Sequence, residues 1–98
     1  MAFKIIWSEP ALGDLASLTG FIAEDNPVAA EKMGSTILKK AVYLNKHPRL
    51  GRVVPEIGKE NIRELIHRPY RIIYSINSKN ESIEILRVWH GARGEPEV

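Results

Sequence analysis

Two helical patterns, separated by a break of two residues, constrain the fold of this chain more than any other feature. Apolar residues recur every three or four positions over 9–24 and again over 27–46, which is the spacing of amphipathic helices. Asn26 is a favourable N-cap between them, and Pro27 suits a first helical position because no amide donor is needed there. Helices joined by so short a connection are expected to pack as an antiparallel hairpin.

One face of the second helix is strongly apolar. Its residues step by three, four, four and three positions: Ala30, Met33, Ile37, Ala41 and Leu44. Such a stripe faces the core of a soluble protein, so we expect it to be buried against the first helix or a sheet. Pro48 ends the helix, because a residue that precedes proline avoids the helical conformation.

Alternating patterns on both sides of the hairpin predict β-strands. Residues 3–8 alternate with a period of two, which favours a strand at the start of the chain. Three more runs, at 62–67, 70–77 and 82–89, are joined by tight turns and predict an antiparallel meander. The last of them is apolar on both faces near its middle, which indicates a central strand.

The period of two also assigns faces within the meander. One face of the run 70–77 carries Tyr70, Ile72, Tyr74 and Ile76. One face of the run 82–89 carries Ile83, Ile85, Arg87 and Trp89.

The expected fold class is therefore α+β in a single domain over 1–98. An N-terminal strand, a helical hairpin and a three-stranded antiparallel meander follow in that order, with the helices packed on one face of the sheet. The loop 47–59 and several arginines remain for the other face, where we expect a shallow basic concavity as the binding site. Residues 91–98 are small and polar, and we expect a flexible tail there.

Composition excludes several classes of protein. The chain has 44% hydrophobic and 27% charged residues, as soluble globular proteins do, and no apolar run long enough to cross a membrane. The absence of cysteine excludes disulfides and thiolate metal sites, and the three histidines lack the spacing of metal ligands. We expect a cytoplasmic protein with no signal peptide, no membrane association, no metal and no cofactor.

The charges are unevenly distributed although the net charge is only +2. All seven arginines lie within 47–98, whereas the Lys and Arg positions within 1–46 are all lysines. Arginine binds phosphates and carboxylates through two parallel hydrogen bonds, so this half could face a polyanion or an acidic partner. The alternative is that the arginines solvate strand edges.

Three local clusters could carry chemistry. In the first, Gly51 permits a turn from which the basic side chain of Arg52 projects. The second combines two guanidiniums with two phenols, from Arg68, Tyr70, Arg71 and Tyr74, and proteins that bind single-stranded nucleic acid use such a combination. His90 ends the last strand and could transfer a proton. Structural roles remain open for each: a solvated turn, a cross-strand pair of Arg71 with Glu64 or Glu84, and a histidine bonded to the backbone.

Six segments in order resemble the RelE/ParE family of bacterial toxins. They are 7–15 (WSEPALGDL), 21–30 (FIAEDNPVAA), 47–52 (HPRLGR), 63–65 (REL), 70–74 (YRIIY) and 88–93 (VWHGAR). The resemblance covers the chain from about residue 3 to 93. It implies the toxin of a type II toxin–antitoxin operon, of the kind formerly called plasmid stabilisation proteins.

The resemblance leaves two activities open. ParE-like members poison DNA gyrase, whereas RelE-like and YoeB-like members cut mRNA on the ribosome. For a ribonuclease, the resemblance points to Glu56, Arg71 and His90 as catalytic residues. However, Gly91 stands where the YoeB-like pattern has an aromatic residue, and Lys59 is the one candidate for the lysines of RelE. We therefore expect a ParE-like gyrase inhibitor and assign it no catalytic residues. A degenerate, non-toxic binding module is a third alternative.

The resemblance also implies two binding surfaces. The target, which is gyrase or alternatively the ribosome and its mRNA, is expected at five residues: Arg68, Arg71, Arg87, His90 and Arg93. A cognate antitoxin with an acidic C-terminal segment is expected to form a hetero-oligomer with the toxin. It is expected to contact the exposed edge of the hairpin and the loop, at Leu18, Phe21, Leu38, Arg49 and Arg52.

Overall fold

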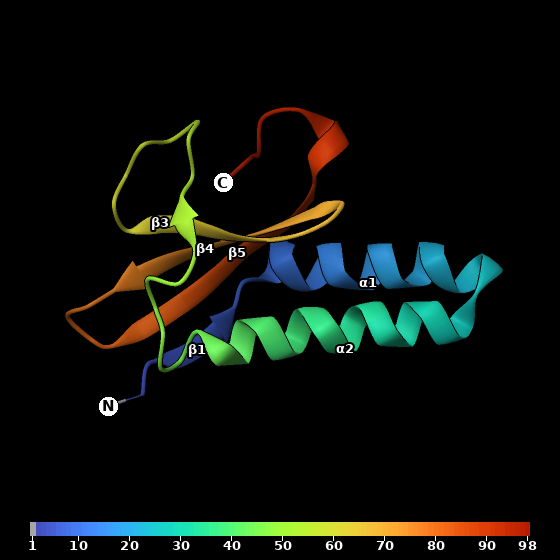
Figure 1. Ribbon diagram of the computed structural model, residues 1–98, viewed down its shortest axis with the longest axis horizontal. Coiled ribbons are helices and arrows are strands. Elements are labelled where there is room, and N and C mark those ends of the chain that lie inside the picture. The colour runs from blue at the N-terminus through green and yellow to red at the C-terminus, as the bar shows by residue number, and fades with distance from the viewer. Residues whose placement is uncertain (1) are drawn as a thin grey trace.

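The computed structural model describes residues 2–98 as one five-stranded sheet with two long helices on one side of it (Figure 1). The elements in chain order are β1 (Lys4–Trp7), α1 (Glu9–Asp25), α2 (Pro27–Tyr43), β2 (Arg52–Val53), β3 (Ile62–His67), β4 (Tyr70–Asn77), β5 (Ser82–His90) and a 3-10 turn, η1 (Gly91–Arg93). The strand order in the sheet is β1-β5-β4-β3-β2. β1 runs parallel to β5, and every other neighbouring pair is antiparallel. The predicted α+β fold and the central place of β5 are confirmed.

The helical hairpin forms where the sequence predicts it. The Ser8 hydroxyl accepts a hydrogen bond from the amide of Ala11, and the Asn26 side chain accepts one from Ala29. These caps satisfy amides that have no partner inside the first turn of each helix. α2 ends at Tyr43 and not at 46, because the chain tightens into a turn in which the amide of Leu44 bonds to Ala41 and that of Asn45 to Val42.

The main core lies between the hairpin and the sheet. Ile37, Ala41 and Leu44 of the predicted stripe are fully buried, Ala30 is nearly so, and Met33 is half-buried against the same cluster. The sheet contributes the predicted face of β4 and residues of β5: Tyr70, Ile72, Tyr74, Ile76, Ile83, Ile85 and Val88. Burial of this apolar surface is what holds the two layers together.

The predicted faces of β5 are wrong beyond its middle. Ile73 pairs with Arg87 and Tyr74 pairs with Ile85, so Leu86 has no partner in β4 and forms a β-bulge. One extra residue exchanges the two faces of the strand that follows it. As a result Ile83 and Ile85 face the helices, whereas Arg87 and Trp89, which pair with Ile73 and Arg71, face the opposite side.

That opposite side carries a smaller core under the loop between α2 and β3. Val54, Ile73 and Trp89 are buried there, with Ile57, Ile62 and Leu86 packed around them. The segment after β5 folds back over it, because the Trp89 indole donates to the carbonyl of Gly94. Residues 91–93 of the expected flexible tail thus form η1, and the mobility of 91–98 stays a prediction. No helix within residues 2–98 is long and apolar enough to cross a membrane.

Candidate functional site

A buried carboxylate organises the charged residues on the loop side of the sheet. Glu64 of β3 is 1% exposed and is the one buried charged residue within 2–98. One of its oxygens accepts from Arg71 Nε at 2.6 Å, and the other accepts from Arg52 Nε at 2.7 Å. A buried charge is tolerated only when paired and hydrogen-bonded in this way. Of the two cross-strand partners considered for Arg71, the structure therefore pairs it with Glu64.

Arg71 makes a second ion pair with the loop. Its two terminal nitrogens donate to the two oxygens of Glu56 at 2.8 and 2.7 Å. Hydrogen bonds to Glu56 and Glu64 raise the pKa of Arg71, and the hydrogen bond from Arg71 lowers the pKa of Glu56 to about 2. Three of the five N–H donors of Arg71 are thereby occupied, and its side chain is largely buried, so the charge is used to hold the loop.

The same loop is attached at two further points. The Tyr74 hydroxyl donates to the carbonyl of Pro48 and accepts from the amide of Gly51, and burial raises the pKa of this phenol. A side chain at Gly51 would begin 2.5 Å from the carbonyl oxygen of Glu64, so only glycine fits. Arg63 bonds to the carbonyl of Gly51 and to Glu60. Gly51 thus serves close packing, while Arg52 projects outward as the sequence suggested.

The Glu56–Arg71 pair makes an acid-dependent contribution to stability. Because the pKa of Glu56 is lowered on folding, its contribution is complete above the ordinary value of 4.5 and is lost as the pH falls toward 2. We expect Glu56→Gln to be less stable than the wild type at pH 7, with a difference in urea midpoint that shrinks between pH 4.5 and pH 2. Glu95→Gln, which alters a carboxylate with no ion pair within 2–98, should leave the midpoint unchanged throughout; a Glu56→Gln difference independent of pH would contradict the assignment.

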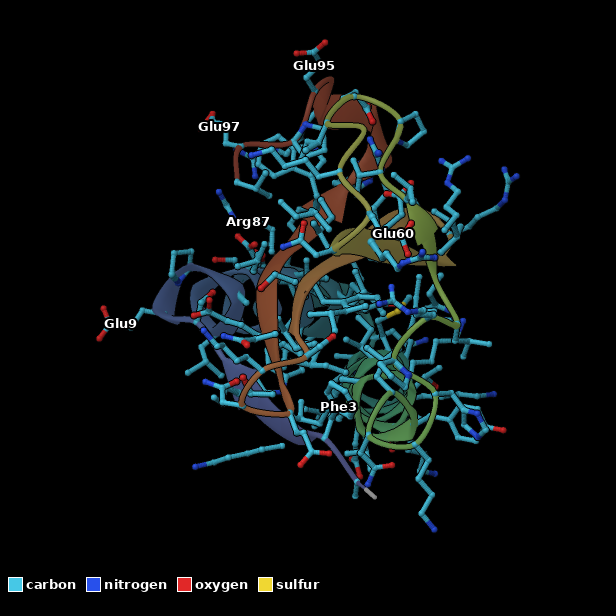
Figure 2. All side chains as sticks on the ribbon, turned by 90° about the vertical axis from the view of Figure 1, so that its left-hand side faces the viewer. Phe3, Glu9, Glu60, Arg87, Glu95 and Glu97 are labelled. Atoms are coloured by element: carbon cyan, nitrogen blue, oxygen red, sulfur yellow. The ribbon has the colours of Figure 1, made fainter. Side chains whose placement is uncertain are left out.

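Arg87 is also engaged within the fold. It bonds to both oxygens of Asp14 on α1 at 2.8 Å and to the carbonyl of Glu97, and the hydrogen bonds to Asp14 raise the pKa of Arg87. Figure 2 shows Arg87 between α1 and the C-terminal segment. Two of the five residues expected to bind a target, Arg71 and Arg87, therefore hold elements of the protein together. Arg68, His90 and Arg93 make no ion pair within residues 2–98.

The three residues expected of a ribonuclease do not converge. Glu56 meets Arg71, but His90 pairs across the strands with Tyr70 while Arg71 pairs with Trp89. Neighbouring residues of a strand point to opposite faces, so the His90 side chain lies on the helix side of the sheet and Arg71 on the loop side. The β-bulge at Leu86 is the cause of this separation. No group of three potential metal ligands forms in the described chain either.

His90 instead lines a hollow of about 260 Å³ between α1, the start of β4 and η1. We call it the Tyr70 hollow, and its polar and aromatic lining residues are Asp14, Ser17, Phe21, Tyr70, His90 and Arg93. The His90 ring stands edge-on to Tyr70, and Nδ1 of His90 accepts a hydrogen bond from the amide of Ala92. Sequence reasoning had identified His90 and Arg93 but assigned no role to Ser17.

The residues expected to bind an antitoxin fall on separate surfaces. Leu18 is 8% exposed and belongs to the core, contrary to its predicted place at an exposed edge. Phe21 is 74% exposed and lines the Tyr70 hollow. Leu38 lines a separate groove of about 700 Å³ between the two helices, which we call the helical groove. Small residues also line it: Ala16, Gly20, Ala23, Ala30 and Gly34. Arg49 and Arg52 lie on the loop and are more than half exposed.

Over residues 5–94, the chain matches the family described as "ParE toxin of type II toxin-antitoxin system, parDE". This chain belongs to the ParE toxin family. Toxin RelE2 of Caulobacter vibrioides is 30% identical to it over 91 residues, which are 92% of this chain and 97% of that protein. The ParE toxin family is part of the RelE/ParE group that the sequence resembles, so the resemblance is confirmed.

Solved structures share the fold of this ParE-family toxin. The chromosomal ParDE system from P. aeruginosa aligns with a TM-score of 0.72 at 21% identity, over 91% of this chain and 96% of that one. The RelBE2 toxin–antitoxin complex from Mycobacterium tuberculosis aligns with a TM-score of 0.65 at 19% identity, over 92% and 99% of the two chains. A mutant E. coli toxin RelE in complex with a peptide of the antitoxin RelB gives 0.65 at 20% identity, over 100% and 87%.

Proposed function

We propose that this ParE-family toxin arrests bacterial growth by poisoning DNA gyrase and that a cognate antitoxin neutralises it. The observation that carries the choice of gyrase over mRNA is the arrangement of Glu56, Arg71 and His90. Cleavage of RNA needs a base, an acid and a positive charge around one phosphate. Here Arg71 is neutralised by two carboxylates and His90 lies on the other face of the sheet.

The target surface is then narrower than the sequence predicts. Arg68, His90 and Arg93 make no ion pair with the described residues 2–98, and the segments that carry them meet where the amide of Gly91 bonds to the carbonyl of Pro69. The turn that holds Arg68 thereby touches the start of η1, which holds Arg93. We place the target-binding surface at this end of the sheet, with Arg71 and Arg87 as supports of the fold.

The helical groove is the place we propose for the antitoxin. Its lining is mostly apolar, and an amphipathic helix laid in such a groove is a recurrent mode of recognition. The neighbouring structures include toxin–antitoxin complexes, which supports a cognate partner for this toxin. An acidic C-terminal segment would complement Lys39 at the groove and the exposed Arg49 and Arg52 on the loop.

A ribosome-dependent ribonuclease is the second candidate. The observation that favours it is the relative named Toxin RelE2, which matches nearly the whole chain at 30% identity. The two candidates differ in what they stop inside a cell: gyrase poisoning breaks DNA, whereas mRNA cleavage stops translation.

Expression of the chain alone from a tightly repressed promoter separates these functions. We expect filamentous cells and a DNA-damage response while amino-acid incorporation continues, and we expect co-expression of the neighbouring small reading frame to restore growth. Purified toxin and its His90→Ala variant should both leave ribosome-bound mRNA intact. Rapid arrest of translation, with cleavage that His90→Ala lowers about 100-fold or more, would establish the ribonuclease instead.

A folding-deficient variant supplies the control for this experiment. Ile37→Asp should not arrest growth, because it removes the fold and not a surface. If cells that express the wild-type chain grow as well as cells that express Ile37→Asp, both toxic functions are contradicted. The chain is then a degenerate binding module.

A further inference from the structure

The Tyr70 hollow contains a phenol that the fold leaves without a partner. Tyr70 is 8% exposed, and its hydroxyl makes no hydrogen bond within residues 2–98. Since every buried polar side-chain atom described has a partner, the unpaired hydroxyl is not fully buried, and Tyr70 is one of the residues that line the hollow. A side chain more than nine-tenths buried, with its one polar group turned to a cavity, is suited to hold a ligand.

Two more donors face the same space. Because Nδ1 of His90 accepts the Ala92 amide, the proton of the neutral ring sits on Nε2, which is free to donate. Arg93 lines the hollow, and its guanidinium packs over the Trp89 ring at 4.1 Å, which holds the group by its face. Asp14 does not oppose an anion here, since both its oxygens are occupied by Arg87 and the amide of Val88.

An exposed aromatic side chain completes the hollow. Phe21 of α1 is 74% exposed, although an apolar ring gains nothing from contact with water. The hollow, at about 260 Å³, is smaller than the roughly 300–1,000 Å³ of pockets that enclose a whole small molecule. It therefore suits one unit of a longer ligand that has an anionic group and a flat ring.

We propose that the Tyr70 hollow binds one nucleotide of a single-stranded nucleic acid. The phosphate accepts hydrogen bonds from Tyr70, His90 Nε2 and Arg93, and the base stacks on Phe21. Cationic grooves with exposed aromatic rings bind single strands in this way without reading sequence. The site uses neither Glu56 nor Arg71, and the proposal concerns binding alone.

Fluorescence anisotropy with a labelled 12-nucleotide oligo-dT tests this site on the purified full-length chain. We expect micromolar binding to the single strand and at least 10-fold weaker binding to a duplex of equal length, whose bases cannot reach Phe21. Phe21→Ala and Arg93→Gln should each raise Kd about 10-fold, and Tyr70→Phe, which removes only the hydroxyl, about threefold or more. An abasic oligomer of the same length should lose the dependence on Phe21.

Lys79→Gln is the control, because it removes one positive charge from the turn between β4 and β5, outside the hollow. It should change Kd less than twofold, and circular dichroism should show that every variant keeps the fold. The proposal is overturned if the wild type does not bind, if Lys79→Gln weakens binding as much as Arg93→Gln, or if Phe21→Ala has no effect. Equal competition by poly-glutamate would also overturn it and identify an acidic peptide as the ligand. None of these results depends on whether the toxin acts on gyrase.

Discussion

Glu64→Ala should destabilise the protein by about 3–5 kcal/mol, which is the usual effect of breaking a buried ion pair from one side. The substitution removes the acceptor for Arg71 Nε and Arg52 Nε and leaves the largely buried Arg71 with Glu56 as its single partner. Such a loss is a large part of the roughly 5–15 kcal/mol that stabilises a typical domain. Urea unfolding followed by circular dichroism would measure it.

Glu60→Ala is the control for this experiment. Glu60 also binds two arginines, Arg49 and Arg63, but its side chain is 68% exposed. Exposed ion pairs contribute little, so we expect a loss of about 1 kcal/mol or less. Similar losses for the two variants would mean that the burial of Glu64 does not determine its importance.

Ile37→Asp should have a comparable or larger effect, of about 4 kcal/mol or more. Ile37 is fully buried in the core between the hairpin and the sheet, and aspartate there would be a charge with no partner. Leu38→Asp changes the next residue of the same helix, which is 45% exposed, and should cost only about 1 kcal/mol. Thermal melts of the two variants compare them directly, and a near-neutral Ile37→Asp would show that the register of α2 is wrong.

The elements with uninterrupted local patterns could be predicted from the sequence. β3 and β4 begin and end at the predicted residues because a period of two runs through both and a turn with proline joins them. The hairpin follows from Asn26-Pro27, whose capping role depends only on neighbouring residues. Helix ends are less certain, and α2 stops three residues early where its last carbonyls accept from a tighter turn.

Features that depend on distant residues could not be predicted. No glycine at Leu86 signals a bulge in the sequence, and the bulge is identified only from the pairing of β5 with β4. The sequence offered Glu64 only as one of two cross-strand partners for Arg71. Its burial and its second partner, Arg52, depend on the closure of the loop over the sheet. The free hydroxyl of Tyr70 is likewise a property of the packed structure, in which α1 and η1 meet β4.

The bulge in β5 has a consequence for the transfer of residue roles between relatives. Insertion or loss of one residue before His90 turns that side chain to the opposite face of the sheet while leaving the motif around it unchanged. Two toxins can thus share a histidine at the same column of an alignment and present it to different partners. Assignments of activity within this family therefore require the strand register of each member, which the sequence motif alone does not give.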